Sequence, residues 1–244
     1  MSAGWAARAR PLLLPALFAT MAFALLVSLG VWQLHRLTWK EGLLAQIDER
    51  LKAKAAPLPP ASSWPSLSQA ADEYRHVTVT GVFDHAKEAF VFRTAGSGLG
   101  EAGFYVLTPL RLDGGGTLLV NRGFVPERLR DSAQRVADQV TGNVTLSGVL
   151  RWPEERNMFT PADEPSRRTW YTRDPPSIAK ALDVADAAPF SLDADPDPKG
   201  AVLRGGATTV NIRNDHLSYA FTWFGLAATL VIVFGLVVWR RLRA

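Results

Sequence analysis

Two long stretches without a charged residue lie near the ends of this chain, at residues 11–34 and 217–239. A hydrocarbon core about 30 Å thick is crossed by about 20 helical residues, so each stretch is long enough to span a membrane. An isolated segment in a bilayer satisfies its backbone hydrogen bonds only as a helix. The rest of the chain is too short to bury both stretches in a soluble core. We therefore predict two antiparallel transmembrane helices, over residues 11–34 and 216–239.

The first stretch shares one feature with a secretory signal peptide, because Arg8 and Arg10 precede it. Its apolar run is too long for a signal peptide, and residues 28–30 make a poor cleavage site because apolar residues continue beyond them. We expect an uncleaved anchor. The tail of residues 1–10 is too short to hold a mitochondrial transit peptide, so we expect a bacterial inner-membrane protein.

Two spans leave both tails, residues 1–10 and 240–244, on one side of the membrane and the intervening region on the other. Within about 20 residues of the spans, the tails carry five Lys or Arg residues and the intervening region carries eight. Long loops cross a membrane largely regardless of charge. The charge pattern alone therefore does not decide which side is cytoplasmic.

The region between the spans is soluble in character. Residues 35–54 carry leucine and isoleucine at helical spacing, which predicts an amphipathic juxtamembrane helix. Four prolines within residues 55–65 indicate a linker. Short runs rich in β-branched and aromatic residues then predict strands, at 76–80, 89–92, 104–108, 117–120, 144–150, 169–172 and 208–212. We expect a membrane α+β protein whose residues 55–215 form a β-rich, mainly antiparallel domain, with a helix at residues 177–182.

Charge and cysteine content exclude several classes of protein. The chain has 27 basic and 23 acidic residues, and five of the basic residues lie in the two tails. The remainder is close to neutral, so no nucleic-acid partner is expected. The absence of cysteine excludes disulfides, thiolate metal sites, covalent haem attachment and copper delivery through a pair of thiolates.

The β-rich region shows no catalytic signature, and we expect no enzyme. His76 and His85 are its only histidines, and we interpret both as structural because no metal-ligand spacing accompanies them. Residues 98–103 match GxGxxG, but a strand-like run follows where a dinucleotide site needs a helix. Residues 193–197, DADPD, lack the glycine and glutamate of a calcium loop, so we interpret them as an acidic turn.

The helix ends at one membrane surface carry more informative residues. Two sets of polar and aromatic residues each share one helical face. They are Trp32, His35, Arg36 and Trp39 after the first span, and His216, Tyr219 and Trp223 before the second. Anchoring at the interface accounts for the aromatic residues, and less well for ionisable groups so close to hydrocarbon. Imidazole ligates haem iron and arginine pairs with carboxylates, so the residues alone are compatible with both anchoring and haem binding.

Residues 29–40, LGVWQLHRLTWK, resemble the segment with which members of the surfeit locus family of oxidase assembly factors leave their first transmembrane helix. Further blocks resembling this family follow in order, at residues 74–83, 108–114, 119–126, 148–161, 170–174 and 211–226. Phe124 stands where the family usually has Trp, which keeps an aromatic residue. The resemblance covers nearly the whole chain, and the ordered blocks between two spans make it specific.

The resemblance implies an inner-membrane protein with residues 55–215 in the periplasm and both tails in the cytoplasm. It implies a role in assembling cytochrome oxidases of the aa3 type, with haem a as the bound cofactor. The ligand attributed to the family maps onto His216, as an axial ligand of the haem iron, and an associated tryptophan maps onto Trp223. From the helical faces we add Tyr219, His35 as a second axial ligand, and Arg36 as a partner of the haem propionates.

We therefore predict a non-catalytic protein surrounded by membrane lipid at its two helices. It receives haem a from the haem a synthase, holds it between the helix ends and passes it to oxidase subunit I. The alternative is a scaffold that stabilises an assembly intermediate through its β-rich domain and never holds haem. A third alternative is a periplasmic enzyme whose site the sequence does not reveal.

Overall fold

The computed structural model describes residues 10–94, 100–196, 202–203, 205 and 214–243. The chain divides into two compact units. The helical unit is built from the two ends of the chain, up to Gln46 and from Asn211 onward. The β-rich unit runs from Ile47 to Val210.

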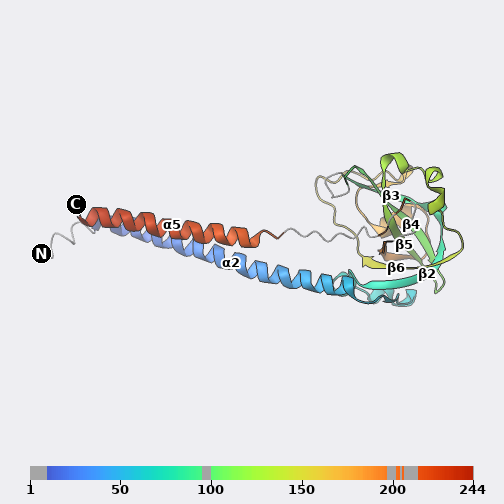
Figure 1. Ribbon diagram of the computed structural model, residues 1–244, viewed down its shortest axis with the longest axis horizontal. Helices are drawn as coiled ribbons and strands as arrows, with labels where there is room; N and C mark the ends of the chain where they lie inside the picture. Colours follow the sequence, from blue (N-terminus) through green and yellow to red (C-terminus); the bar gives the residue numbers. More distant parts are fainter. Residues whose placement is uncertain (1–9, 95–99, 197–201, 204, 206–213, 244) are drawn as a thin grey trace. The chain divides into compact units, whose positions relative to one another are not determined.

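Two long helices make up the helical unit (Figure 1). A short 3-10 turn, η1 (Arg10–Leu12), leads into α2 (Leu13–Lys52), and α5 (His216–Arg243) is the last element of the chain. By length and composition, both helices are long and apolar enough to cross a membrane. The predicted first span and the predicted juxtamembrane helix form one uninterrupted helix, because no proline occurs between Pro15 and Pro57.

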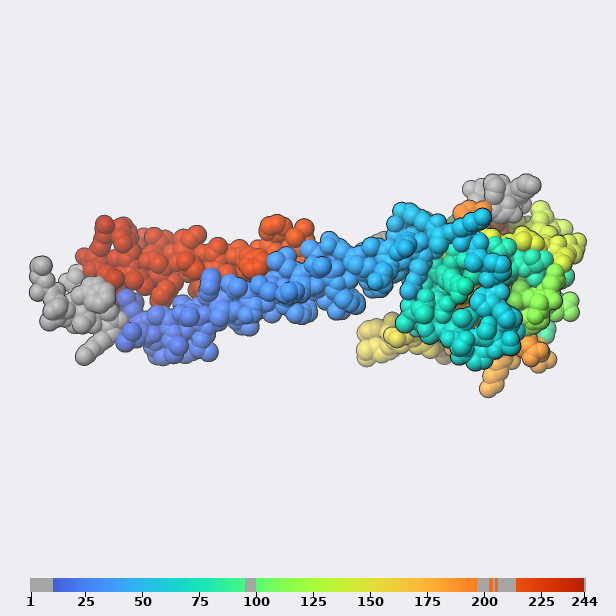
Figure 2. All heavy atoms as spheres, turned by 90° about the horizontal axis from the view of Figure 1, so that it is seen from below, coloured from blue at the N-terminus to red at the C-terminus, as the bar shows by residue number. Residues whose placement is uncertain are grey.

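The helices α2 and α5 lie side by side and run in opposite directions (Figures 1 and 2). Gly30 of α2 lies against Phe224, and Gln33, three residues later, lies against His216, eight residues earlier on α5. Small residues allow the close approach. A Cβ atom at Gly30 would lie 2.7 Å from the Phe224 ring, and Ala220 of α5 is buried. The predicted antiparallel pairing of these helices is therefore confirmed.

The strands described in the β-rich unit form one sheet of eight. They are β1 (Ala56–Pro57), β2 (His76–Phe83), β3 (Ala89–Arg93), β4 (Gly103–Leu112), β5 (Thr117–Pro126), β6 (Asn143–Arg151), β7 (Thr169–Trp170) and β8 (Ala187–Ala194). Six of the seven predicted runs coincide with β2 to β7. The seventh, residues 208–212, lies outside the described residues.

The sheet closes into a barrel because β2 pairs with both β6 and β4 (Figure 1). The ring of strands is β2-β6-β8-β5-β4, in which β5 and β8 are parallel and the other four pairings are antiparallel. Outside the ring, β1 pairs in parallel with β2 and β7 with β3. Most pairings are therefore antiparallel, as predicted, but the barrel is mixed because β5 and β8 pair in parallel. A strand that returns after a long crossover, as β8 does, is able to pair in parallel.

The sequence analysis does not predict β8, although this strand lies between β5 and β6 in the barrel. Its three alanines and Pro189 make a weak strand signal. Phe190 and Leu192 of β8 are fully buried in the core. The predicted acidic turn at residues 193–197 is corrected at its first two residues, because Asp193 and Ala194 belong to β8 and Asp193 is buried, and its last residue, Asp197, lies outside the described residues.

Short helices fill the connections of the β-rich unit. They are η2 (Ala61–Ser66), α3 (Gln69–Asp72), η3 (His85–Lys87), η5 (Glu127–Leu129), η6 (Ser132–Asp138), η7 (Pro165–Arg167) and α4 (Pro175–Ala181). The helix predicted over residues 177–182 is confirmed as α4. Asp174 caps it by accepting a hydrogen bond from the Ser177 N–H, and prolines occupy its first turn.

The predicted linker over residues 55–65 is instead part of the β-rich unit. Its first residues pair with β2, and Trp64 is buried with its ring centroid 5.8 Å from that of Phe190. Gly116, at φ +81°, makes room for this ring, because a Cβ atom there would lie 2.5 Å from it. Prolines are compatible with an edge strand and with a 3-10 turn, so four prolines in this segment do not by themselves indicate a linker.

Candidate functional site

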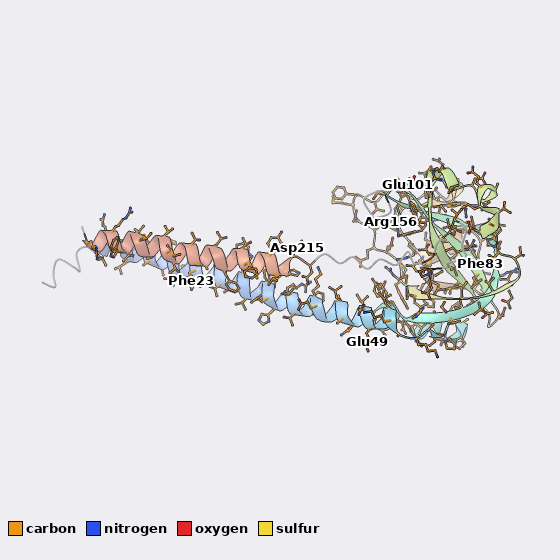
Figure 3. All side chains as sticks on the ribbon, viewed as in Figure 1. Phe23, Glu49, Phe83, Glu101, Arg156 and Asp215 are labelled. Atoms are coloured by element: carbon orange, nitrogen blue, oxygen red, sulfur yellow. The ribbon has the colours of Figure 1, made fainter. Side chains whose placement is uncertain are left out.

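One polar pair lies between the two helices of the helical unit. His216 is the first residue of α5, directly after Asp215 (Figure 3), and its Nδ1 lies 2.7 Å from Oε1 of Gln33 on α2. Gln33 is only 9% exposed. A side-chain carbonyl oxygen accepts but does not donate, so the proton of this hydrogen bond lies on Nδ1 of His216. In the neutral ring, Nε2 then carries the lone pair and is available to ligate a metal.

Aromatic residues border this imidazole. Trp32 of α2 meets the ring of His216 edge-on, with centroids 6.5 Å apart and planes at 86°. Trp223 is half-buried and follows His216 by seven residues, about two helical turns, so both lie on one face of α5. Tyr219 is exposed. The arrangement is a single histidine with flat apolar surface around it.

His35 and Arg36 are placed differently. Both are exposed, and His35 follows Gln33 by two residues, which is about 200° around the helix. His35 therefore lies on the side of α2 away from α5, and no contact among the described residues joins it to His216. Arg36 stacks over the ring of Trp39, 4.0 Å from its centroid. The structure does not bring either residue to His216, and their roles stay predictions.

Gln33 is absent from the site residues predicted from the sequence. Those residues belong to the aromatic and charged face of the helix end, whereas α2 meets α5 through the face that contains Gly30 and Gln33. The sequence nevertheless contains a signal for Gln33. Gln33 is the only amide side chain within residues 11–34, and a polar side chain in an apolar helix typically bonds to a neighbouring helix.

The β-rich unit buries several charged groups as pairs. Asp193 of β8 accepts hydrogen bonds from Arg173 at 2.9 and 3.1 Å and from the Asn121 amide at 2.9 Å. Arg173 also lies 3.2 Å from Glu154. Burial alone would raise the pKa of Glu154, but the positive charges of Arg173 and Arg93 outweigh burial and lower it. The opposite charges of these groups offset one another, which indicates a structural role.

The two histidines of the β-rich unit are held by the fold. His76 lies 2.9 Å through Nδ1 from the Ala53 carbonyl oxygen and 2.7 Å through Nε2 from Asp195. Nε2 of His85 lies 2.8 Å from the carbonyl oxygen of Val140. Within the described ranges, no group of three or more His, Asp or Glu residues is placed to hold a metal ion. The helix pair is therefore the better candidate for a ligand site.

Fold and site together define a class of protein. This chain pairs two apolar helices from its ends, carries a closed mixed β-barrel between them in sequence, and holds one histidine against a buried glutamine. The SURF1 family matches residues 20–228, a range that includes Gln33, His216 and Trp223. The chain belongs to the SURF1 family, which confirms the resemblance seen in its sequence.

Three relatives show the extent of the similarity. Surfeit locus protein 1 of Mus musculus is 39% identical over 216 residues, covering 82% of this chain and 68% of the mouse protein. Surfeit locus protein 1 of Homo sapiens is 37% identical over 217 residues, covering 82% and 69%. A SURF1-like protein of Monosiga brevicollis is 39% identical over 211 residues, covering 82% and 78%.

Proposed function

We propose that this chain is an assembly factor for a haem–copper oxidase of the aa3 type, which binds haem a on its helix pair and helps to insert it into subunit I. Membership of the SURF1 family supports the assembly role. The observation that carries haem binding is the imidazole of His216, which is bonded through Nδ1 to Gln33 and has Nε2 available. The protein performs no catalytic step in this proposal.

The residues present fit a haem. Histidine is a common axial ligand of haem iron, and Nε2 of His216 is the nitrogen that the bond to Gln33 leaves for it. Trp32 and Trp223 offer aromatic surface, and the exposed leucine, valine and phenylalanine side chains of both helices suit a hydrocarbon tail. Haem a supplies the redox chemistry of the client oxidase, whereas this chain binds the group and releases it.

In this proposal both helices cross the bacterial inner membrane and contact lipid. The β-rich unit lies in the periplasm, and both tails lie in the cytoplasm. The haem a synthase delivers the cofactor and subunit I receives it, so dissociation must be fast enough for transfer. His35 as a second axial ligand and Arg36 as a propionate partner have less geometric support than His216, because neither lies in contact with it.

One feature of the β-rich unit favours the alternative, a scaffold that holds no haem. Met158 and Phe159 are 89% and 84% exposed, next to Arg156 (Figure 3). Two hydrogen bonds hold their turn: the Asn157 side-chain oxygen accepts one from the Phe159 N–H at 2.8 Å, and the Asn157 backbone carbonyl oxygen accepts one from the Thr160 N–H at 3.0 Å. Two adjacent apolar side chains exposed on this turn offer a contact for a partner protein.

The absorption spectrum of the full chain tests the two functions. The protein is purified in detergent from cells that also express a haem a synthase, beside its His216→Ala variant. We expect a haem a spectrum in the parent and its loss, or a weakening of at least about tenfold, in the variant. His35→Ala, at an exposed histidine on the same helix pair, tests the predicted second axial ligand, and retention of the spectrum in this variant would leave His216 as the essential ligand.

Three results would change the proposal. If the parent holds no haem while subunit I still co-purifies, the scaffold is correct. If His216→Ala retains haem unchanged, the ligand is another residue. If both His216→Ala and His35→Ala lose the haem, the predicted second axial ligand is correct despite its position on the outer face of α2.

A further inference from the structure

The amide of Gln33 occupies a position that haem ligation alone does not require. It is buried in the helix pair, and its carbonyl oxygen accepts a hydrogen bond from Nδ1 of His216, with the two heavy atoms 2.7 Å apart. A histidine that ligates a metal almost always donates its other ring N–H to a second group, which fixes the tautomer and the orientation of the ring. Gln33 stands in the position of this second group.

We propose that Gln33 is a positioning residue for His216. By accepting a hydrogen bond from Nδ1–H, it keeps the unprotonated Nε2 available to the iron and prevents the ring from rotating about its side-chain bonds. This inference rests on the proposed haem binding and adds to it a residue that does not touch the iron.

The choice of an amide, rather than a carboxylate, matters for release. A carboxylate hydrogen-bonded to the ring raises the basicity of a ligating histidine and strengthens the bond to the metal. A neutral amide fixes the same tautomer with a weaker electronic effect, and it avoids placing a charge beside apolar helices. Gln33 therefore suits a site that must orient its ligand and still let the cofactor leave.

The position of Gln33 depends on helix packing. Gly30 lies one turn before it on the same face of α2 and is in contact with the ring of Phe224. This close contact sets how far α2 is shifted along α5, and so it sets which residue of α2 faces His216. The bond is a property of the paired helices and not of either helix alone.

The tautomer is measurable without any haem. The chain has four histidines, so ¹⁵N-histidine labelling of the full chain in detergent gives a simple spectrum, and His216→Ala identifies the signals of His216. We expect the parent to carry the proton on Nδ1 and the Gln33→Leu variant to lose this preference. Gln33→Glu restores an acceptor and should restore the signature. Gln46→Leu, an exposed glutamine on the same helix, should change nothing.

Haem titration of the same proteins supplies the second readout. We expect Gln33→Leu to weaken haem binding about 10- to 100-fold, and Gln33→Glu to bind at least as tightly as the parent and release haem more slowly. The inference is overturned if the parent carries the proton on Nε2, or if Gln33→Leu changes neither the tautomer nor the affinity. If the parent binds no haem at all, the proposed function itself fails, and Gln33 is then only a packing contact whatever the tautomer.

Discussion

The two units bury polar groups in different ways. In the β-rich unit the buried charges form ion pairs, such as Arg173 with Asp193 at 2.9 Å and Arg135 with Glu88 at 2.9 Å. In the helical unit the buried amide of Gln33 pairs with the partly buried imidazole of His216. Paired charges neutralise one another and fix a fold, whereas an amide bonded to one nitrogen of an imidazole leaves the other ring nitrogen outside that bond.

The difference follows from the surroundings of each pair. A charge placed between apolar helices is costly and needs a partner or water. The barrel supplies such partners from several strands and loops, so charges are tolerated there when their geometry is good. The comparison agrees with a structural role for the ion pairs of the barrel and with the ligand-binding role that we propose for the pair of Gln33 and His216.

The largest effect on the free energy of unfolding should come from removing one partner of a buried ion pair in the barrel. Arg173→Met leaves Asp193 buried with its main cation removed, and we expect the free energy of unfolding to fall by about 3–5 kcal/mol. Urea unfolding of the full chain in detergent, followed by tryptophan fluorescence, measures it. Arg167→Met is the control, because Arg167 is an exposed arginine whose pair with Glu164 is expected to contribute less than about 1 kcal/mol.

A second variant separates the lost pair from lost packing. Arg173→Met combined with Asp193→Leu removes both charges, so it should recover much of the stability lost in the single variant. If Arg173→Met is no more destabilising than Arg167→Met, the barrel pair is not structural and the contrast between the two units disappears.

The second-largest effect on stability should come from the contact between Gly30 of α2 and Phe224 of α5. A methyl group at Gly30 meets the ring of Phe224, so Gly30→Ala should destabilise the helix pair by about 1–3 kcal/mol and weaken haem binding with it. Thermal unfolding followed by circular dichroism, together with haem titration, measures both. Gly42→Ala is the control on the same helix, because nothing lies within 4 Å of its added Cβ and alanine favours the helix.

A compensating substitution tests whether the clash with Phe224 causes the loss of stability in Gly30→Ala. Phe224→Ala combined with Gly30→Ala removes the clash and should restore pairing relative to Gly30→Ala alone. Equal behaviour of Gly30→Ala and Gly42→Ala would contradict the packing that brings Gln33 to His216.

Much of the fold is predictable because its signals are local. The two apolar helices follow from length and composition, and six strands follow from short runs of β-branched and aromatic residues. The closure of the barrel is not predictable in this way, because it depends on pairing between strands far apart in sequence, such as β5 with β8. Pro189 in β8 and the prolines around Trp64 mimic loops, and only the tertiary core shows that these segments are ordered.

The candidate site likewise contains residues that local sequence patterns predict and one residue that they do not. His216 and Trp223 share a helical face that the sequence alone identifies, and the structure keeps them together on α5. Gln33 is absent from that prediction, and His35 lies on the opposite side of α2. The face of α2 that meets α5 is decided by the contact between Gly30 and Phe224, a property of two helices that no periodicity within one helix reveals.

A smaller effect should appear as a pH dependence of the β-rich unit. Burial alone would lower the pKa of His76, but hydrogen bonds to the Ala53 carbonyl oxygen and to Asp195 outweigh burial and raise it above 6.5. Because the pKa is raised in the folded state, this stabilisation is complete below about pH 6.5 and is lost as the pH rises through the folded value. The Asp195 side chain is 43% exposed, so we expect less than about 1 kcal/mol.

Urea unfolding of the full chain at a series of pH values measures the contribution of His76 to the free energy of unfolding. His76→Gln should flatten the loss of stability above about pH 6.5, and Asp195→Asn should reduce it by removing the charge that favours the protonated ring. If the stability of His76→Gln depends on pH as strongly as that of the parent, groups other than His76 cause the pH dependence.

The smallest effect on stability should come from the exposed turn of the β-rich unit. Met158→Ser with Phe159→Ser should change the free energy of unfolding by less than about 0.5 kcal/mol, because neither side chain is buried. Phe104→Ser, the same change at a buried phenylalanine, should be strongly destabilising. The double variant should also retain haem, since it leaves the helix pair intact. If subunit I then no longer co-purifies, the two units have separate tasks: the helices bind the cofactor, and the turn on the barrel contacts the client.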